Sequence, residues 1–338
     1  MSALQGLSSR VEYEVSVGRS GYSRPIVLSE QKENNHMAKS WFPGHMKKAI
    51  DEIMEYLKLI NVVIEVVDAR APNASSNPNL QKLLGGKPKV IALNKADLAD
   101  SYITREWIKN LNTNDQVVIE CNFNTGEGVA KVIKEAKRLA METMKKNSMI
   151  SNIKVRALVV GLPNVGKSSF INRTAKKVKA KVADKPGVTR TKQWILVDTH
   201  MELLDTPGIM PPRIDSISVW FCLCLLGIIG DKLLEHEALA FSLIEVCEEL
   251  YPKALSEKYG ISDDLKEPAD IFEAIGVRRG LLRAGGVVDM QKTSEVILKD
   301  FKQGQIGKMS LERPDVEVDY EKYVNKYFAN LSIDEESF

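Results

Sequence analysis

A glycine-rich turn between a predicted strand and a predicted helix constrains this chain more than any other feature. Residues 161–168 read GLPNVGKS and fit the phosphate-loop pattern GxxxxGK[ST]. An apolar run before the turn predicts a strand, and the spacing after it predicts a helix, which is the context that this motif requires. In such a loop Lys167 contacts the β- and γ-phosphates of a nucleotide, and Ser168 offers a hydroxyl to Mg²⁺. The turn therefore predicts a nucleotide site with Lys167 as a catalytic residue.

Two later segments fit the same site. The motif DTPG begins at Asp205, directly after a predicted strand. An acid at this place can hold Mg²⁺ through water, and the N–H of Gly208 can face the γ-phosphate. PGVTR lies between the two motifs, and its Thr189 is predicted to ligate Mg²⁺ and to sense the γ-phosphate, with Thr191 as the competing candidate.

The motif NKAD, residues 94–97, indicates which base is bound. It follows the predicted strand KVIAL. An aspartate in the position of Asp97 can accept hydrogen bonds from both the N1–H and the exocyclic amine of guanine. Adenine offers neither group in that arrangement and would leave a buried charge unpaired. The three motifs together therefore predict GTP and GDP as ligands.

Apolar, β-branched runs alternate with helical patterns over most of the chain. Strands are predicted within 61–70, 89–97, 116–122, 155–160, 194–198 and 201–205. This alternation predicts an α/β fold with a doubly wound sheet, in which ligands bind beyond the carboxyl ends of the strands. The expected parts are a flexible extension (1–36), the nucleotide-binding domain (37–215), a small all-helical domain (216–313) and an acidic tail (314–338).

Composition excludes several other classes of protein. The 47 Lys and Arg residues exceed the 45 Asp and Glu residues by only two, so total charge does not mark a nucleic-acid binder. The four cysteines form no CxxC pair, which favours reduced thiols over a disulfide framework. The longest apolar run, 217–229, has 13 residues, whereas a membrane span needs about 20, so it predicts a buried helix. With no signal-peptide pattern, we expect a cytoplasmic protein without a membrane partner.

The motifs occur in an unusual order, because NKAD precedes the phosphate loop and DTPG. This order resembles that of the circularly permuted GTPases. The segments that carry the closest resemblance are WFPGHM, DARAPNASSNP, GLPNVGKSSFINR, PGVTR and DTPGI. They are most similar to the ribosome biogenesis GTPase A group, also called YlqF or RbgA, with its mitochondrial relatives close behind. The resemblance spans 37–313 and implies GTP hydrolysis coupled to late maturation of the large (50S) ribosomal subunit. It also implies rRNA and pre-ribosomal particles as partners, and a monomer off the ribosome.

The same resemblance implies which residues lie beside the nucleotide. Guanine contacts would fall on Asn94, Lys95, Ala96, Asp97, Asn122 and Phe123. Phosphate contacts would fall on Asn164, Val165, Gly166, Lys167, Ser168, Ser169 and Gly208. Mg²⁺ would be held by Ser168, Thr189 and Asp205. Members of the group usually have a small residue at position 123, so Phe123 departs from the pattern.

The residue after DTPG bears on hydrolysis. Many GTPases have a glutamine there to orient the attacking water, but this chain has Ile209, which can neither donate nor accept a hydrogen bond. The resemblance selects His45, in the turn PGHM, as the catalytic residue; the alternative is a histidine that caps the following helix. Asn164 resembles the asparagine that ligates K⁺ in potassium-activated relatives. Without K⁺, Asn164 would only stabilise the loop.

Two features of the sequence bear on which molecules this protein binds. After DTPGI the group usually continues with a Trp-Pro-Lys pattern and a more polar helix, whereas residues 211–230 here depart from that pattern and 216–230 are unusually apolar. Basic residues gather in 131–156, with a net charge of +6, in 173–192, and at Arg278, Arg279 and Arg283. Such runs are either solvated helix faces or contacts to RNA phosphates.

Two other functions remain open at this point. One is an RNA-docking module that holds GTP and barely hydrolyses it, which Ile209 permits. The other is a different permuted GTPase that acts on another ribosomal particle. That group carries extra RNA-binding or zinc domains ahead of the GTPase, for which we see no room in this chain.

Overall fold

A computed structural model describes residues 51, 53–147, 154–179, 194–211, 214, 216–230 and 235–328. All of them belong to one compact unit, Ser40–Phe338. The expected extension 1–36 and the candidate residues His45, Thr189 and Thr191 lie outside the described residues.

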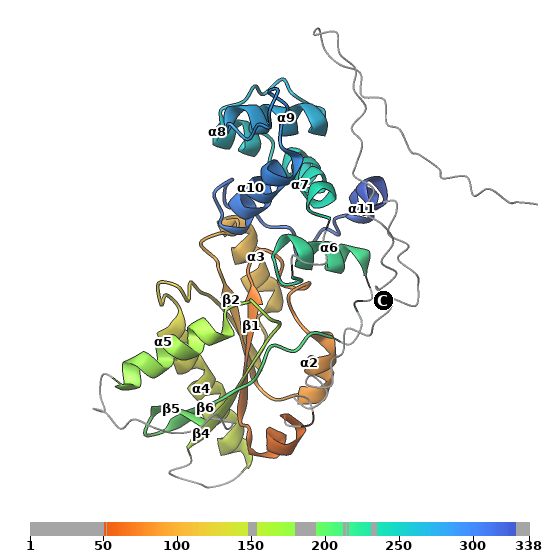
Figure 1. Ribbon diagram of the computed structural model, residues 1–338. Helices are drawn as coiled ribbons and strands as arrows, with labels where there is room; N and C mark the ends of the chain where they lie inside the picture. The colour runs from red at the N-terminus through yellow and green to blue at the C-terminus, as the bar shows by residue number, and fades with distance from the viewer. Residues whose placement is uncertain are drawn as a thin grey trace, which may run out of the picture. The chain divides into compact units, whose positions relative to one another are not determined.

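Six strands form a single mixed sheet (Figure 1). They are β1 (Val62–Asp68), β2 (Lys89–Asn94), β3 (Gln116–Glu120), β4 (Val155–Val160), β5 (Trp194–Asp198) and β6 (Met201–Asp205). Their order in the sheet is β3-β2-β1-β4-β6-β5, and all neighbours are parallel except β5, which runs antiparallel to β6. The predicted strands are thus confirmed. The order reverses between β1 and β4, and open α/β sheets bind ligands at such a switch point.

Helices cover both faces of this sheet. α2 (Pro78–Leu84) and α3 (Ser101–Leu111) lie on one face, and α4 (Val129–Asn147) and α5 (Lys167–Lys179) lie on the other. The seven residues of β1 are all buried, and alternate ones belong to different cores. Ile64 packs in the core that contains α4, whereas Val63 packs in the core that contains α2. A parallel strand that helices cover on both faces is buried along its whole length, as β1 is, so the doubly wound fold is confirmed.

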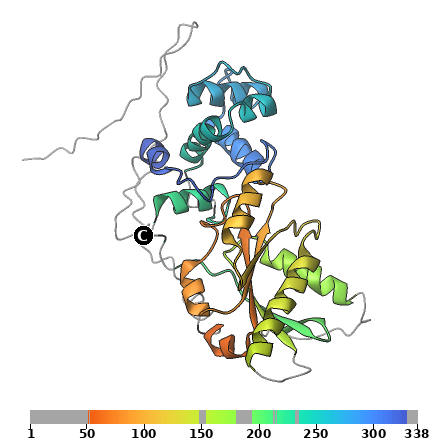
Figure 2. The ribbon, with the colours of Figure 1, turned by 180° about the vertical axis from the view of Figure 1, so that it is seen from behind.

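The remaining helices follow the sheet in sequence. They are α6 (Ile217–Leu225), α7 (His236–Leu250), α8 (Ala254–Tyr259), α9 (Pro268–Arg278), α10 (Met290–Lys302) and α11 (Glu321–Tyr327), and one 3₁₀ turn, η1 (Leu57–Leu59), precedes β1. α7 packs against α8, α9, α10 and α11, and so lies at the centre of this helical region (Figure 2).

The apolar run is a buried helix, as predicted. Residues 221–226, which are the end of α6 and the residue after it, are all buried. The Phe221 ring lies 5.2 Å from the Tyr320 ring and 6.4 Å from the Tyr323 ring, and Trp220 meets Phe328 edge to face at 5.6 Å. Aromatic side chains from the end of the chain therefore cover α6. Within the described part of the chain, no helix combines the length and the apolar character that crossing a membrane requires.

The segment expected to be an acidic tail contains α11 and the residues that cover α6. Lys322 and Lys326 pair with Glu249 and Glu245 of α7. Tyr320 is 2% exposed, although acids surround it in the sequence. The prediction of a tail rested on the charge of this segment alone. The spacing of its aromatic residues places one apolar face against α6 and α7.

Candidate nucleotide site

Three loops meet at the carboxyl ends of β2, β3 and β4, and one side chain joins them. Asn94 is 4% exposed, and its Nδ2 donates to the Val165 carbonyl of the phosphate loop at 2.7 Å. Its Oδ1 accepts from the Phe123 N–H, in the loop after β3, at 3.0 Å. The structure thereby brings NKAD, the phosphate loop and the predicted base-side loop together.

The phosphate loop has the backbone conformation that its sequence predicts. Asn164 has φ +59° and Gly166 has φ +111°, both in the left-handed region. A Cβ added to Gly166 would lie 2.1 Å from Nδ2 of Asn94, so only glycine fits where the two loops touch. α5 begins at Lys167, and Ser168 in its first turn is exposed. The positive end of a helix therefore follows the loop directly, as anion binding requires.

Lys167 is buried but has no carboxylate in hydrogen-bond contact within the described ranges. Its Nζ donates to the Leu162 carbonyl at 2.7 Å, and the residue is 7% exposed. Burial lowers the pKa of Lys167 to about 8, against the opposing effect of Asp205. Burial likewise raises the pKa of Asp205, while Lys167 and the Thr206 N–H lower it. A poorly solvated ammonium on this loop suits a ligand that brings phosphate charge, so Lys167, Ser168 and Asp205 fit a phosphate and its Mg²⁺.

The DTPG segment lies directly against the phosphate loop. A Cβ on Gly208 would meet Pro163 backbone atoms at 2.8 Å, and the Ile209 N–H donates to the Gly161 carbonyl at 3.3 Å. Nδ2 of Asn77 donates to the Ile209 carbonyl at 2.9 Å. The Ile209 side chain is 2% exposed and packs in the core beneath β1 and β4. The position that carries glutamine in many GTPases is thus a core position here.

The NKAD turn presents its aspartate to solvent. Asp97 is exposed, and the Leu98 N–H closes the turn on the Lys95 carbonyl at 2.9 Å. The Ala96 N–H donates to the Cys121 carbonyl at 3.1 Å, which joins this turn to the end of β3. Asp97 is therefore free to accept hydrogen bonds from a ligand.

In the loop after β3, the side chains of Asn122 and Phe123, which were predicted to contact guanine, contact the protein itself. Oδ1 of Asn122 accepts from the N–H groups of Asn124 and Thr125 at 3.0 and 3.2 Å, so this side chain shapes its own turn. The Phe123 ring is 1% exposed and lies 5.0 Å from the Phe170 ring of α5. The large residue at position 123 is accommodated because its ring enters the core between the sheet and α5.

Two charged residues at this edge were missed in the sequence analysis. Asp68 ends β1 directly opposite Asn94, and its Oδ2 pairs with Nζ of Lys95 at 2.9 Å. Arg70 donates to both carboxylate oxygens of Asp68, each at 2.9 Å. An acid at the end of a predicted strand was the available signal, but its partners are set by the sheet.

The helical region also touches the phosphate loop. Nδ2 of Asn164 donates to the Gly227 carbonyl, in the turn after α6, at 3.0 Å. The candidate K⁺ ligand therefore has a protein partner on the segment that leads away from DTPG.

Four of the eight basic residues in the run 131–156 have acidic partners among the described residues. Arg138 pairs with Glu135 and Glu142 along α4, and Lys137 pairs with Asp198. Lys154 and Arg156 share Glu202 at 2.8 and 2.7 Å. These pairs offset part of the positive charge of this run.

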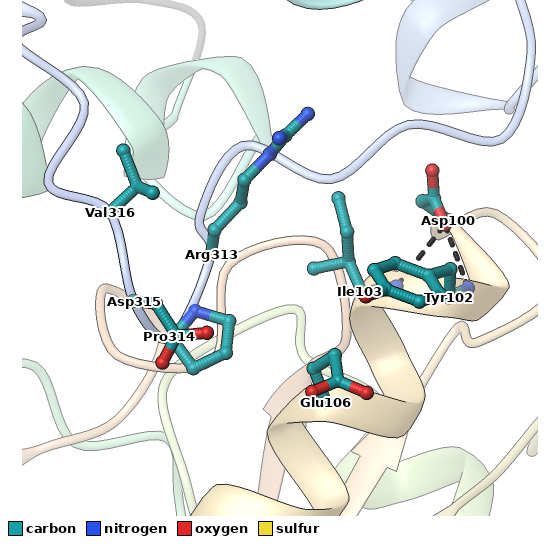
Figure 3. A pocket seen from close by; sticks show the side chains of 8 residues that line it. All are labelled: Asp100, Tyr102, Ile103, Glu106, Arg313, Pro314, Asp315 and Val316. Carbon is teal, nitrogen blue, oxygen red and sulfur yellow. Dashed lines mark hydrogen bonds between the residues drawn. The ribbon is translucent and has the colours of Figure 1, made fainter.

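A hollow of about 210 Å³ lies beside α3, away from the phosphate loop (Figure 3). Asp100, which caps α3 through the N–H groups of Tyr102 and Ile103, lines it together with Glu106 and residues 313–316. It contains no residue of the phosphate loop or DTPG, so it is distinct from the nucleotide site.

Comparison with known proteins agrees with this geometry. Residues 156–249 match a family described as 50S ribosome-binding GTPase. Ribosome biogenesis GTPase A of Bacillus cereus is 42% identical over 282 residues, covering 82% of this chain and 95% of the relative. The chain belongs to the ribosome biogenesis GTPase A family. It is therefore a GTPase, with the P-loop fold of that family.

More distant members agree with this assignment. Ribosome biogenesis GTPase A of Thermotoga maritima is 32% identical over 82% of this chain and 95% of its own length. Mitochondrial ribosome-associated GTPase 1 of Bos taurus is 31% identical over 81% of this chain and 88% of its own length. The crystal structure of GNP-bound YlqF from T. maritima has a TM-score of 0.57 at 29% identity and covers 80% of this chain and all of that one.

Proposed function

We propose that this ribosome biogenesis GTPase hydrolyses GTP during late maturation of the large ribosomal subunit. It binds rRNA or pre-ribosomal particles in a GTP-dependent way, acts in the cytoplasm and is a monomer off the ribosome. The observation that carries the proposal is the meeting of NKAD, the phosphate loop and DTPG at the switch point of the sheet. Family membership supplies the link to ribosome assembly.

In this proposal each part of the nucleotide has its own contacts. Asp97 accepts two hydrogen bonds from guanine, and the loop 164–169 with Lys167 holds the phosphates. Ser168, Thr189 and Asp205 would hold Mg²⁺, which would neutralise charge on the phosphates. Gly208 faces the γ-phosphate through its N–H.

Hydrolysis needs a group other than Ile209, because that side chain is buried in the core. We assign the positioning of water to His45, which a docked particle brings into place. Oδ1 of Asn164 would supply one ligand to K⁺ if this ion binds, while its Nδ2 donates to the Gly227 carbonyl.

The helical region 216–313 is the proposed docking part. Arg278 at the end of α9 and Arg283 in the segment that follows are exposed, so RNA phosphates can reach them, although Arg283 also pairs with Asp289 at 3.1 Å. We propose that the basic run on α4 contributes less to RNA binding, because ion pairs offset part of its charge.

Guanine recognition is tested by Asp97→Asn. This variant should lose affinity for GTP and gain affinity for xanthosine triphosphate, because the C2 oxygen of xanthine needs a donor. Fluorescence titration with both nucleotides gives the answer. An unchanged preference for GTP removes Asp97 from the base site.

The role on the particle is tested by turnover with and without immature large subunits. The parent should be slow alone and faster with particles, and should bind particles more tightly with a non-hydrolysable GTP analogue than with GDP. His45→Ala should keep GTP affinity and particle binding but lose the stimulation. Equal stimulation makes His45 structural, and equal particle affinity with both nucleotides contradicts the switch.

Ile209 also favours a second candidate, a docking module that holds GTP with little turnover. Its buried side chain and its Asn77-bound carbonyl offer no group that orients water. The same turnover experiment separates the two functions, since the module would show no stimulation by any ribosomal particle.

A further inference from the structure

A fully buried carboxylate lies between the NKAD loop and the helical region. Asp68 is 0% exposed, and two cations share it. Oδ2 pairs with Nζ of Lys95 at 2.9 Å, while Oδ1 and Oδ2 accept from Nε and Nη2 of Arg70, each at 2.9 Å. Burial alone would raise the pKa of Asp68, but Arg70 and Lys95 together hold it well below its usual range. The two cations therefore favour the ionised form of Asp68.

Lys95 has a backbone conformation that requires support. Its φ is +60°, in the left-handed region that residues other than glycine seldom adopt. Such a conformation persists where surrounding contacts determine it. The Asp68 carboxylate fixes the ammonium end of Lys95, so the four-carbon stem is the part left to lie against a flat heterocycle.

Arg70 connects the same carboxylate to α10. Its Nη1 donates to the Phe301 and Lys302 carbonyls at 3.5 and 3.3 Å, and its guanidinium lies 5.6 Å from the centre of the Phe301 ring. The Leu311 N–H donates in turn to the Arg70 carbonyl at 2.7 Å. Arg70 is 1% exposed, so these contacts are made without competition from water.

We propose that Asp68 is a positioning residue for guanine recognition that acts by holding Lys95, and that Arg70 transmits occupancy of the base site to the end of α10. This rests on the proposed function, because it takes Lys95 as a contact to guanine. The contacts from Lys95 through Asp68 and Arg70 to α10 would connect the base site to the helical region without involving the phosphate loop.

A double-mutant cycle on GDP affinity tests the positioning. Asp68→Asn and Lys95→Met should each weaken GDP by about tenfold, and the double variant should bind no more weakly than Lys95→Met alone. Glu65→Gln is the matched control, because Glu65 of β1 pairs with Lys89 of β2 at 2.9 Å, between the same two strands but farther from the loops. A purely structural Asp68 predicts losses that multiply to about a hundredfold, and that result overturns the proposal.

Hydrogen exchange tests the transmission and does not need Asp68→Asn to fold. In the parent, GDP should slow exchange of the Gln303, Gly304 and Gln305 amides, which bond to carbonyls at the end of α10. Lys95→Met should lose this protection at saturating GDP, whereas the control Lys89→Met should keep it. Protection that survives in Lys95→Met contradicts the proposal.

The variant Asp97→Asn distinguishes a wrong role for Asp68 from a wrong assignment of the guanine site. If that variant prefers xanthosine nucleotides while the cycle is multiplicative, the base site is correct and the positioning role of Asp68 is wrong. If that variant keeps its preference for guanine, the base site itself is misassigned.

Discussion

At the scale of single residues, several side chains of the candidate nucleotide site already form hydrogen bonds within the protein. Asn94 bonds to two other loops, and Gly166 must lack a side chain because Asn94 fills that space. Lys167 differs, since a backbone carbonyl is its hydrogen-bond partner and burial weakens its hold on a proton. Its protonation should therefore respond to the arrival of phosphate.

GTP binding should take up a proton above pH 8. The pKa of Lys167 in the free protein is about 8, and phosphate charge beside the ammonium raises it. At pH 8.5 the free lysine is mostly neutral and the bound one is charged, so affinity should fall as pH rises through this range, by at most about tenfold per pH unit. Calorimetry in two buffers of different ionisation enthalpy measures the uptake.

Lys167→Arg is the control, because a guanidinium stays charged throughout this range. It should bind more weakly but without proton uptake. Equal uptake by the parent and by this variant would assign the proton to another group.

At the scale of elements, α6 shows how a strongly apolar helix is kept from solvent. It packs against α7, α10 and α11, and the aromatic residues around α11 contact the rings of Phe221 and Trp220. A seven-residue helix is too short to be stable by itself, so α11 and α6 depend on each other.

Phe221→Ala should destabilise the protein by about 3–5 kcal/mol, since it removes a fully buried ring and leaves a cavity. Val219→Ala, on the same helix but only partly buried, should cost less than about 1.5 kcal/mol. Urea unfolding of both variants measures the difference. Equal costs would mean that the ring contacts of Phe221 contribute little.

At the scale of the whole molecule, Glu312 joins the end of the helical region to the turn after β1. Its carboxylate accepts from the Asn73 and Ala74 N–H groups at 2.7 and 2.9 Å. Burial raises the pKa of Glu312 to about 7, although these two N–H groups oppose the shift. The folded protein therefore binds a proton between pH 4.5 and 7 that the unfolded chain releases.

The contribution of Glu312 to stability should be full below pH 4.5 and lost as pH rises through 7. Compared with Glu312→Gln, the parent should lose about 1–3 kcal/mol of unfolding free energy between pH 5 and pH 8. Chemical denaturation of both proteins across this range measures the difference. Glu295→Gln, an exposed change on α10, should show no such pH-dependent difference from the parent.

The sequence predicts those parts of this molecule whose chemistry is local. A phosphate loop, an NKAD turn and their flanking strands each lie within a few residues, so they were found without coordinates. The roles of Asp68 and Arg70 are not evident from the sequence, because Asp68 meets Lys95 only through the pairing of β1 with β2, and Arg70 meets the end of α10 more than 200 positions away. α11 was taken for tail because its stability comes from α6 and α7 and not from its own composition.

The place of β1 in the sheet has a consequence for synthesis on the translating ribosome. β1 pairs with β2 on one side and β4 on the other, yet β4 begins at Val155, long after β1 ends at Asp68. At roughly 5–20 residues per second, one edge of this largely apolar strand stays unpaired for about 4–17 s. An unpaired apolar edge can recruit strands of other chains. The nascent chain therefore passes through an interval in which this open edge of β1 is exposed to association with other chains.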